Sequence, residues 1–212
     1  MSPSYRVNFV SRSGQRVSFR MDERPAAPKA AVVILQTDQG PWSDPDLDDL
    51  RAALRAHHLH CFVLDLSGLE STDHAHESIE DFLNRGADAM KKRPAVLLGC
   101  GPAAEIALSF MQHQQAQIKE AQNKTQTKHP KISGPAAARV APQKAPRMGL
   151  KVHTEKRISA AVVSGLEEQQ TEQAKNRFQK RLLIGPANAT AKQTLGWIRK
   201  EMVSWLQKMK PW

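Results

Sequence analysis

The sequence predicts an α/β protein with a mostly parallel sheet flanked by helices and an N-terminal β-hairpin. Short apolar runs, typical of buried parallel strands, alternate along the chain with longer amphipathic segments, typical of helices. Ahead of them, polar and apolar residues alternate with a period of two on both sides of Gly14, which is the pattern of a hairpin over residues 5–20. Strands that alternate with helices favour a parallel sheet covered on both faces.

The remaining elements follow in chain order. After the hairpin and a proline-containing linker, the apolar runs predict buried strands at 30–35, 60–66, 94–99, 158–163 and 181–184. The periodicity of the segments between and after them predicts helices at 44–56, 77–92, 103–121, 166–178 and 190–208. Ser43 or Asp44 is expected to cap the first helix. A polar loop is expected over 67–74.

Length and composition favour one core without a membrane anchor. The 212 residues suffice for one good core, the mean hydropathy is −0.52, and no apolar run reaches the length of about 18 residues that spans a bilayer. The first residues lack the apolar stretch of a secretory signal. We therefore expect a cytoplasmic protein in which Cys61 and Cys100 are reduced thiols rather than a disulfide.

The net charge of +10 is distributed unevenly. Residues 38–88 hold 12 acidic and 3 basic residues, whereas residues 119–157 hold 10 basic and 2 acidic ones. Prolines and alanines interrupt the second stretch, and few large apolar residues occur in it. We therefore expect a single domain built from 1–122 and 156–212, with a basic, Pro/Ala-rich excursion over 123–155 that is mobile or ordered by a partner.

The excursion is the predicted binding segment. A solvated charged loop is the plainest interpretation, and recruitment of a partner protein is the main functional one. Phosphates of nucleic acid or of an anionic lipid surface are alternatives, although the segment has no aromatic residue on which a base could stack. The candidate binding residues are Lys124, Lys128, Lys131, Arg139, Lys144, Arg147 and Lys151.

The turn Gly99-Cys100-Gly101-Pro102 follows a buried strand and precedes a helix, where α/β proteins place their chemistry. In the frame of a G-x-S-x-G nucleophile elbow, Gly99 takes the first position and Gly101 the position of the nucleophile, which therefore has no side chain. Cys100 is one residue early. A thiol at a helix N-terminus can be reactive, but a buried, inert thiol is the preferred interpretation.

Two other interpretations of this turn stay open. Gly99, Gly101 and Ala104 match a weak Gly-x-Gly-x-x-Ala pattern, which would allow a nucleotide- or S-adenosylmethionine-dependent enzyme. No acidic residue ending a following strand supports it within about 20 residues. Small residues that let a helix pack closely on its strand explain the same pattern without a ligand. No cofactor is therefore expected.

A group of histidines suggests a metal site only weakly. His57, His58 and His60 precede Cys61, and imidazole and thiolate are zinc ligands. The spacing is neither a Cys-x-x-Cys nor a helical His-x-x-x-His pattern. A solvated helix C-terminus, where histidine favours the helix dipole, is the preferred interpretation, and no metal is expected.

The order of the elements resembles the α/β-hydrolase family, and more narrowly an uncharacterised bacterial group of hydrolase-like proteins. Three parts carry this resemblance: the strand and loop 33–40 with the helix 46–54, the elbow around Gly99, and the segments 177–185 and 194–198. The resemblance implies a serine nucleophile, an acid and a histidine. Gly101 stands where the serine belongs, Thr37 and Asp38 replace a His-Gly pair, and no histidine follows the last strand.

Asp65 ends a strand where a remnant acid could lie, although a loop-capping role is preferred. Because the serine and histidine are missing, the sequence predicts a non-catalytic, hydrolase-like binding or assembly protein. A nucleotide- or S-adenosylmethionine-dependent enzyme and a nucleic-acid or anionic-membrane binder are the alternatives.

Overall fold

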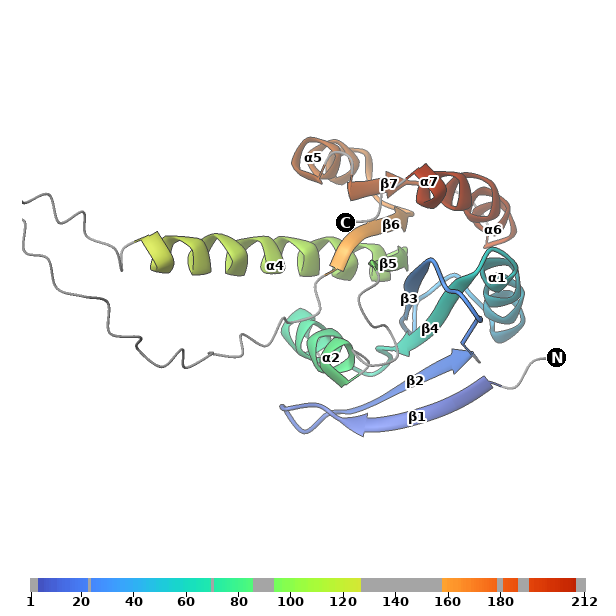
Figure 1. Ribbon diagram of the computed structural model, residues 1–212, viewed down its shortest axis with the longest axis horizontal. Helices are drawn as coiled ribbons and strands as arrows, with labels where there is room; N and C mark the ends of the chain where they lie inside the picture. Colours follow the sequence, from blue (N-terminus) through green and yellow to red (C-terminus); the bar gives the residue numbers. More distant parts are fainter. Residues whose placement is uncertain are drawn as a thin grey trace, which may run out of the picture.

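One sheet organises the molecule (Figure 1). The computed structural model describes residues 4–22, 24–69, 71–85, 94–126, 158–178, 181–186 and 191–208. Its seven-stranded sheet has the order β1-β2-β4-β3-β5-β6-β7. The strands are β1 (Ser4–Val10), β2 (Arg16–Asp22), β3 (Ala30–Gln36), β4 (Leu59–Asp65), β5 (Ala95–Cys100), β6 (Ile158–Ser164) and β7 (Leu182–Ile184).

The hairpin is antiparallel and the rest of the sheet is parallel. β1 pairs with β2, and β2 with β4, in antiparallel register. The pairs β3–β4, β3–β5, β5–β6 and β6–β7 are all parallel. The predicted fold class is therefore confirmed, including the N-terminal hairpin.

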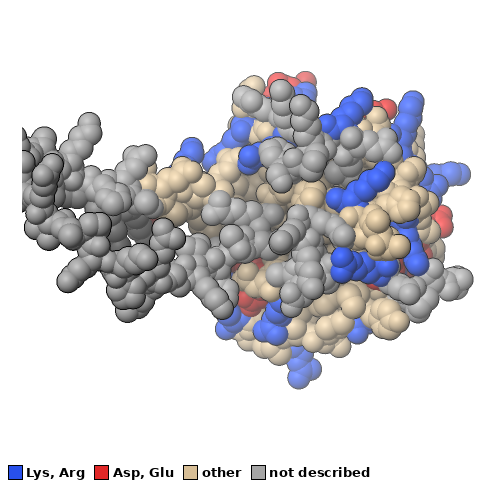
Figure 2. Space-filling view, viewed as in Figure 1, with Lys and Arg blue, Asp and Glu red and all other residues tan. Residues whose placement is uncertain are grey.

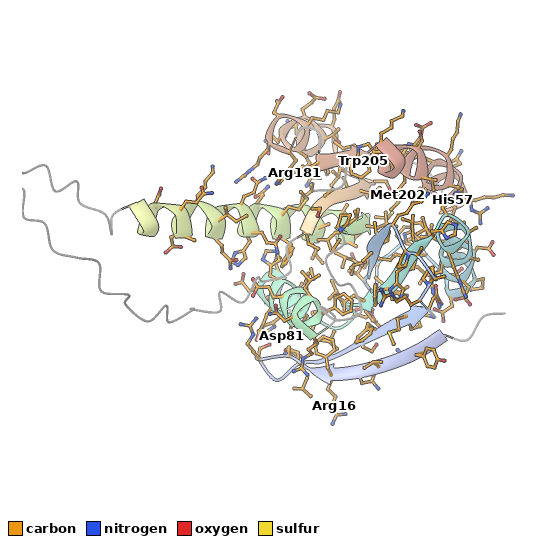
Figure 3. The ribbon with its side chains drawn as sticks, in the orientation of Figure 1. Arg16, His57, Asp81, Arg181, Met202 and Trp205 are labelled. Carbon is orange, nitrogen blue, oxygen red and sulfur yellow. The ribbon has the colours of Figure 1, made fainter. Side chains whose placement is uncertain are left out.

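Helices cover both faces of this sheet. On one face lie α2 (Thr72–Arg85), α4 (Pro102–Gln126) and α5 (Glu168–Phe178), and on the other lie α1 (Asp44–Ala56) and a C-terminal helical segment. That segment runs as α6 (Ala191–Trp197), the π-helical turn η2 (Ile198–Met202) and α7 (Val203–Lys208). Met202 is buried against the sheet and Trp205 packs beside it, partly exposed (Figure 3). Two apolar clusters, one on each face, make up the core.

Local sequence explains where two helices begin. Ser43 caps α1 in a capping box, because its Oγ accepts from Asp46 N at 3.4 Å while the Asp46 carboxylate accepts from Ser43 N at 3.1 Å. α2 begins at Thr72, earlier than the predicted residue 77, because Ser71 Oγ accepts from His74 N at 3.2 Å. The expected polar loop is correspondingly shorter.

Two further predictions are corrected or left open. α4 continues to Gln126, so the first residues of the predicted excursion are helical. The rest of the excursion, 127–155, lies outside the described residues, and its predicted mobility stays a prediction. None of the described helices is long and apolar enough to span a membrane. Lys and Arg side chains, blue in Figure 2, are spread over the visible face rather than gathered in one patch.

Candidate functional site

The turn between β5 and α4 has the backbone of a nucleophile elbow. Gly101 has a φ of +60°, in the left-handed region that glycine adopts without strain. Its N–H donates to Ser164 O at 2.9 Å, and its carbonyl accepts from Ala104 N at 2.9 Å. The chain therefore passes from strand to helix in one sharp turn at the carboxyl edge of the sheet.

Gly99 is required by close packing of α4 on β5. A Cβ at this position would lie 2.3 Å from Ala103 O and 2.6 Å from Ala103 C. Both atoms are backbone, so neither can move aside without shifting the start of the helix. The small-residue pattern of the turn is thus explained by packing.

The chemical groups of an acyl-enzyme mechanism are missing from this turn. Gly101 has no side chain that could attack a substrate. In a hydrolase elbow the N–H of the next residue stabilises the oxyanion, and here that residue is Pro102, which has no N–H. The missing N–H of Pro102 can be read from the sequence, but it was not among the sequence-based expectations. A covalent intermediate at position 101 is excluded.

Cys100 lies beneath the turn and faces the interior. Its side chain is buried, with Sγ 3.1 Å from the hydroxyl of Ser164. Burial raises the pKa of the thiol to about 11, and contacts with Ser164 and Trp42 oppose that shift only in part. Because the thiolate is the nucleophile, this cysteine is inert at neutral pH.

The backbone of the turn does not offer a phosphate cradle. The weak nucleotide pattern would need the N–H groups around Gly99, Gly101 and Ala104 to face a ligand. Gly101 N already donates to Ser164 O, and Ala104 N donates to Gly101 O. Two of the three positions are therefore engaged within the fold.

Asp65, the possible remnant acid, faces the hairpin. Its Oδ1 accepts from Ser67 N at 3.1 Å, and its Oδ2 lies 3.6 Å from Arg6 Nη2 and 3.5 Å from Ser18 Oγ. These contacts are those of a loop-capping carboxylate. Asp65 does not line the pocket next to the elbow.

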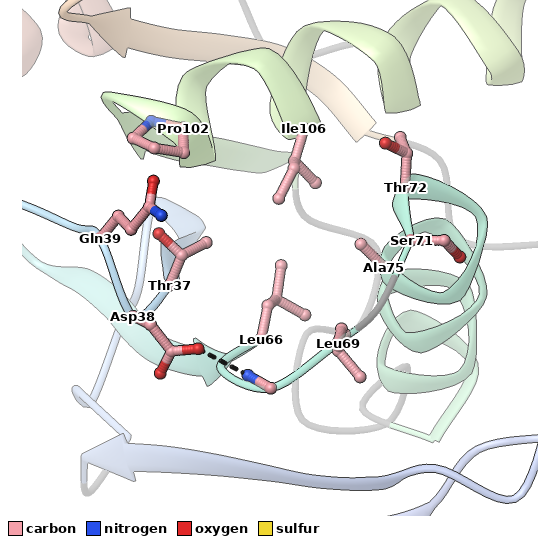
Figure 4. Close-up of a pocket in the computed structure, with 11 residues that line it drawn as sticks. Thr37, Asp38, Gln39, Leu66, Leu69, Ser71, Thr72, Ala75, Pro102 and Ile106 are labelled. Atoms are coloured by element: carbon pink, nitrogen blue, oxygen red, sulfur yellow. Dashed lines mark hydrogen bonds between the residues drawn. The ribbon is translucent and has the colours of Figure 1, made fainter.

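That pocket lies where three loops meet at the carboxyl edge of the sheet (Figure 4). It has a volume of about 330 Å³. The loop after β3, the loop after β4 with the start of α2, and the start of α4 contribute its lining. The lining residues are Thr37, Asp38, Gln39, Leu66, Gly68, Leu69, Ser71, Thr72, Ala75, Pro102 and Ile106.

The pocket combines an apolar wall with one carboxylate. Leu66, Leu69 and Ile106 supply apolar surface, while Asp38 Oδ2 accepts from Gly68 N at 2.8 Å and so joins the two strand-end loops. Thr37 Oγ1 is buried and has no hydrogen-bond partner within the described chain. None of the lining residues is Lys, Arg or His. The lining therefore favours an uncharged or cationic ligand over an anion.

The histidines before Cys61 do not assemble a metal site. His57 ends α1 and His58 has a φ of +60°, both exposed, in keeping with a solvated helix end. His60 departs from that expectation, because it is buried in β4 with Nε2 3.2 Å from Asp22 O. In the described ranges, no group of three or more His, Cys, Asp or Glu side chains is placed to hold a metal ion.

The predicted binding residues of the excursion lie largely beyond what the structure describes. Lys124 belongs to α4. Lys128, Lys131, Arg139, Lys144, Arg147 and Lys151 fall outside the described residues. A partner for this segment stays a prediction.

His76 joins α2 to α4 and makes stability depend on pH. Its Nε2 lies 2.8 Å from Ser109 Oγ, and its ring lies 5.5 Å from that of His113. Burial, and then the charge of His113, lower the pKa of His76 from 6.5, while Asp73 and Glu80 oppose the shift. The unfolded chain therefore binds the proton more readily than the folded chain.

We expect the free energy of unfolding to fall as the pH drops from 7 through 6.5, and to level off below the lowered pKa of folded His76. His76→Gln should flatten this part of the profile. Urea unfolding measured between pH 5 and pH 7.5 (roughly the range in which histidine titrates) checks this. An unchanged slope in His76→Gln would contradict the assignment.

The fold is similar to that of solved hydrolases. A cold-adapted esterase from an Arctic intertidal metagenomic library matches with a TM-score of 0.62 and 8% identity, over 98% of this chain and 94% of that one. An esterase of Pyrococcus furiosus matches with 0.61 and 9%, over 98% and 93%. A dienelactone hydrolase of Anabaena variabilis matches with 0.58 and 14%, over 97% of each chain.

The chain therefore has an α/β-hydrolase-like fold, as the order of its elements indicated. No protein-family model matches it, and no curated protein matches it significantly in sequence. The narrower resemblance to an uncharacterised bacterial group thus finds no support.

These likenesses overturn the prediction of a non-catalytic binding or assembly protein. The solved proteins that share this fold are named as esterases and a dienelactone hydrolase, not as binding or assembly proteins. The prediction rested on the empty position at Gly101. That position excludes a covalent intermediate at residue 101 and leaves attack by water open.

Proposed function

We propose that the chain hydrolyses small esters by direct attack of water in the pocket beside the elbow, with Asp38 as the general base. The observation that carries the proposal is the placement of this carboxylate in a partly apolar pocket at the carboxyl edge of a hydrolase-like sheet. Open α/β sheets bind their ligands at this edge. The solved neighbours are too distant in sequence for their site residues to be carried over. The proposal therefore rests on the pocket of this chain.

The reaction balances without a covalent intermediate. Asp38 takes a proton from a water molecule as the water oxygen bonds to the ester carbonyl carbon. The tetrahedral intermediate collapses, the bond to the alcohol oxygen breaks, and the proton passes from Asp38 to the departing alkoxide. The products are the carboxylic acid and the alcohol, and Asp38 is again ionised.

Two features can stabilise the negative oxygen that develops on the substrate. The Thr37 hydroxyl is buried without a partner in the described chain, and a rotation of its side chain toward the pocket would let it donate a hydrogen bond there. The N-terminus of the 25-residue helix α4 reaches the pocket through Pro102 and Ile106, and its dipole favours negative charge there. Together they would stabilise the oxyanion in place of the backbone N–H that Pro102 lacks, although less strongly.

The lining indicates the substrate class. Leu66, Leu69 and Ile106 suit a short acyl chain, and the pocket volume of about 330 Å³ suits a small molecule. The Asp38 carboxylate repels a substrate that carries a negative charge, and no lining residue is a cation that could offset this repulsion. We therefore expect uncharged short-chain esters to be hydrolysed faster than esters that carry a negative charge.

We also propose a cytoplasmic location. Cys61 and Cys100 are both free and both buried in the core. Unpaired thiols are typical of proteins in a reducing compartment.

Asp38→Asn tests the proposed function. The amide oxygen can still accept from Gly68 N, so the two loops should stay joined, but the side chain no longer takes a proton. We expect hydrolysis of p-nitrophenyl butyrate to fall by about 10²-fold or more, measured by nitrophenolate release. The proposal fails if purified wild-type protein releases no more nitrophenolate than buffer, or if Asp38→Asn retains full activity.

Glu105→Gln is the matched control. Glu105 is an exposed carboxylate on the first turn of α4, and its Oε1 accepts from Gln170 Nε2 at 3.1 Å, away from the pocket lining. Removal of this charge should leave the rate unchanged. A loss equal to that of Asp38→Asn would show a general effect of negative charge at this edge.

A further inference from the structure

β1 leaves one edge of the sheet open. It is the first strand in the sheet order, so one of its two sides has no neighbouring strand among the described residues (Figure 1). The large apolar side chains that are exposed in the described part of the chain are all in β1: Tyr5 at 52%, Val7 at 37% and Val10 at 52%. An edge strand with exposed apolar side chains is a template for pairing with another strand.

The apolar face of the hairpin continues to this edge. Side chains alternate along a strand, so Tyr5, Val7 and Phe9 share one face of β1. They stand opposite Met21, Phe19 and Val17 of β2, respectively. Phe9 and Val17 are buried in the core, and Phe19 and Met21 pack against it. The apolar row thus runs outward from the core and ends at the exposed Tyr5 and Val7.

The usual protections of an edge strand are missing from β1. Its pairing with β2 runs from Ser4 to Val10 without a shift in register, so no bulge twists the edge away. The strand contains no proline and no lysine, and Arg6 is its only charged residue. Arg6 lies on the face opposite to Tyr5 and Val7.

We propose that β1 pairs with β1 of a second copy of the chain, antiparallel about a two-fold axis at Val7. In this register Tyr5 stands opposite the partner subunit's Phe9, and Val7 opposite the partner subunit's Val7. Arg6 stands opposite the partner subunit's Asn8, so no like charges meet. The apolar row becomes continuous across the two-fold axis and covers the exposed Tyr5 and Val7.

The sequence of β1 favours this register and a second copy as the occupant. A two-fold axis at Val7 sets apolar side chains opposite apolar ones, because Val7 faces the partner subunit's Val7 and Tyr5 faces the partner subunit's Phe9. An axis one residue earlier would place Arg6 opposite the partner subunit's Arg6, where like charges repel. The paired sheets would form one continuous sheet of fourteen strands, twice the seven of one chain.

The first test is the mass of the full-length protein in solution by light scattering after size-exclusion chromatography. We expect a dimer for the wild type and a monomer for Val7→Lys at the same concentration, because the variant places two charges at the axis. Ala52→Lys adds the same charge at an exposed position of α1 and should remain dimeric. Urea unfolding establishes that Val7→Lys is folded.

The second test fixes the register. Val7→Cys should form a disulfide-linked dimer on mild oxidation, because residues directly opposite in antiparallel strands lie within reach of a disulfide. Ala52→Cys should not, and the native Cys61 and Cys100 are buried and should not interfere. If the wild type is monomeric at every concentration, the proposal is wrong, and a strand of another protein becomes the candidate partner of β1. A dimer that survives Val7→Lys overturns it too.

Discussion

Replacement of Gly99 by alanine is expected to lower the free energy of unfolding by about 3 kcal/mol. The new Cβ would lie 2.3 Å from Ala103 O and 2.8 Å from Ala104 N. Because these are backbone atoms of the first turn of α4, relief of the clash must move the helix away from β5. Movement of α4 would in turn open the buried contacts of Ala103, Ala107 and Phe110.

Gly196→Ala is the control for this prediction. Nothing lies within 4 Å of a Cβ at Gly196, which belongs to α6. Alanine is the better helix former, so this variant should gain roughly 0.5–1 kcal/mol. Urea unfolding followed by circular dichroism compares the two variants with the wild type. Equal stabilities of Gly99→Ala and the wild type would contradict the packing described at the elbow.

The second large effect is expected at the buried ion pair between Arg51 and Asp22. The two side chains are 6% and 9% exposed, and the pair joins α1 to the end of β2. Arg51 Nη1 also donates to Asp48 Oδ1 at 2.7 Å. Arg51→Met would leave the Asp22 carboxylate buried without its cation, at a cost of about 3–5 kcal/mol in the free energy of unfolding.

A double variant separates the loss of the pair from the loss of packing. Arg51→Met combined with Asp22→Leu removes both charges, and it should recover much of the stability that Arg51→Met loses. Lys175→Met is the surface control. It breaks an exposed ion pair with Glu172 (2.7 Å) and should cost no more than about 0.5 kcal/mol. Equal free energies of unfolding for Arg51→Met and Lys175→Met would contradict this prediction. They would show that the buried pair does not stabilise the contact between the hairpin and α1.

The sequence was sufficient to predict the sheet but not the ends of its helices. β3 begins with six apolar residues, 30–35, and its burial pattern is that of a central parallel strand, which such a run predicts. α2 was expected to begin at residue 77 because the apolar periodicity starts there. Its first turn is polar and is set by the cap from Ser71, a local hydrogen bond that periodicity does not report.

The candidate site could be predicted only at the elbow. Gly99 and Gly101 predict the sharp turn. Pro102 indicates that the oxyanion donor is missing, because proline has no backbone N–H. Asp38 carries no such signal. Its proposed role as the general base depends on residues from other parts of the chain. Gly68, from the loop after β4, holds the carboxylate at the pocket, and the start of α2 contributes to the lining.

The error in the predicted function has the same origin. The sequence-based prediction equates an empty nucleophile position with an inactive site. The structure retains a pocket with a carboxylate and an unpartnered hydroxyl, and water can replace a serine as the attacking group.

The most direct test of direct water attack is the mass of the intact protein, sampled while it hydrolyses p-nitrophenyl butyrate. The account predicts sustained nitrophenolate release in the wild type, little release in Asp38→Asn, and an unchanged protein mass throughout. A protein mass increased by one butyryl group would show a covalent acyl-enzyme and contradict the account. So would the absence of any release above buffer.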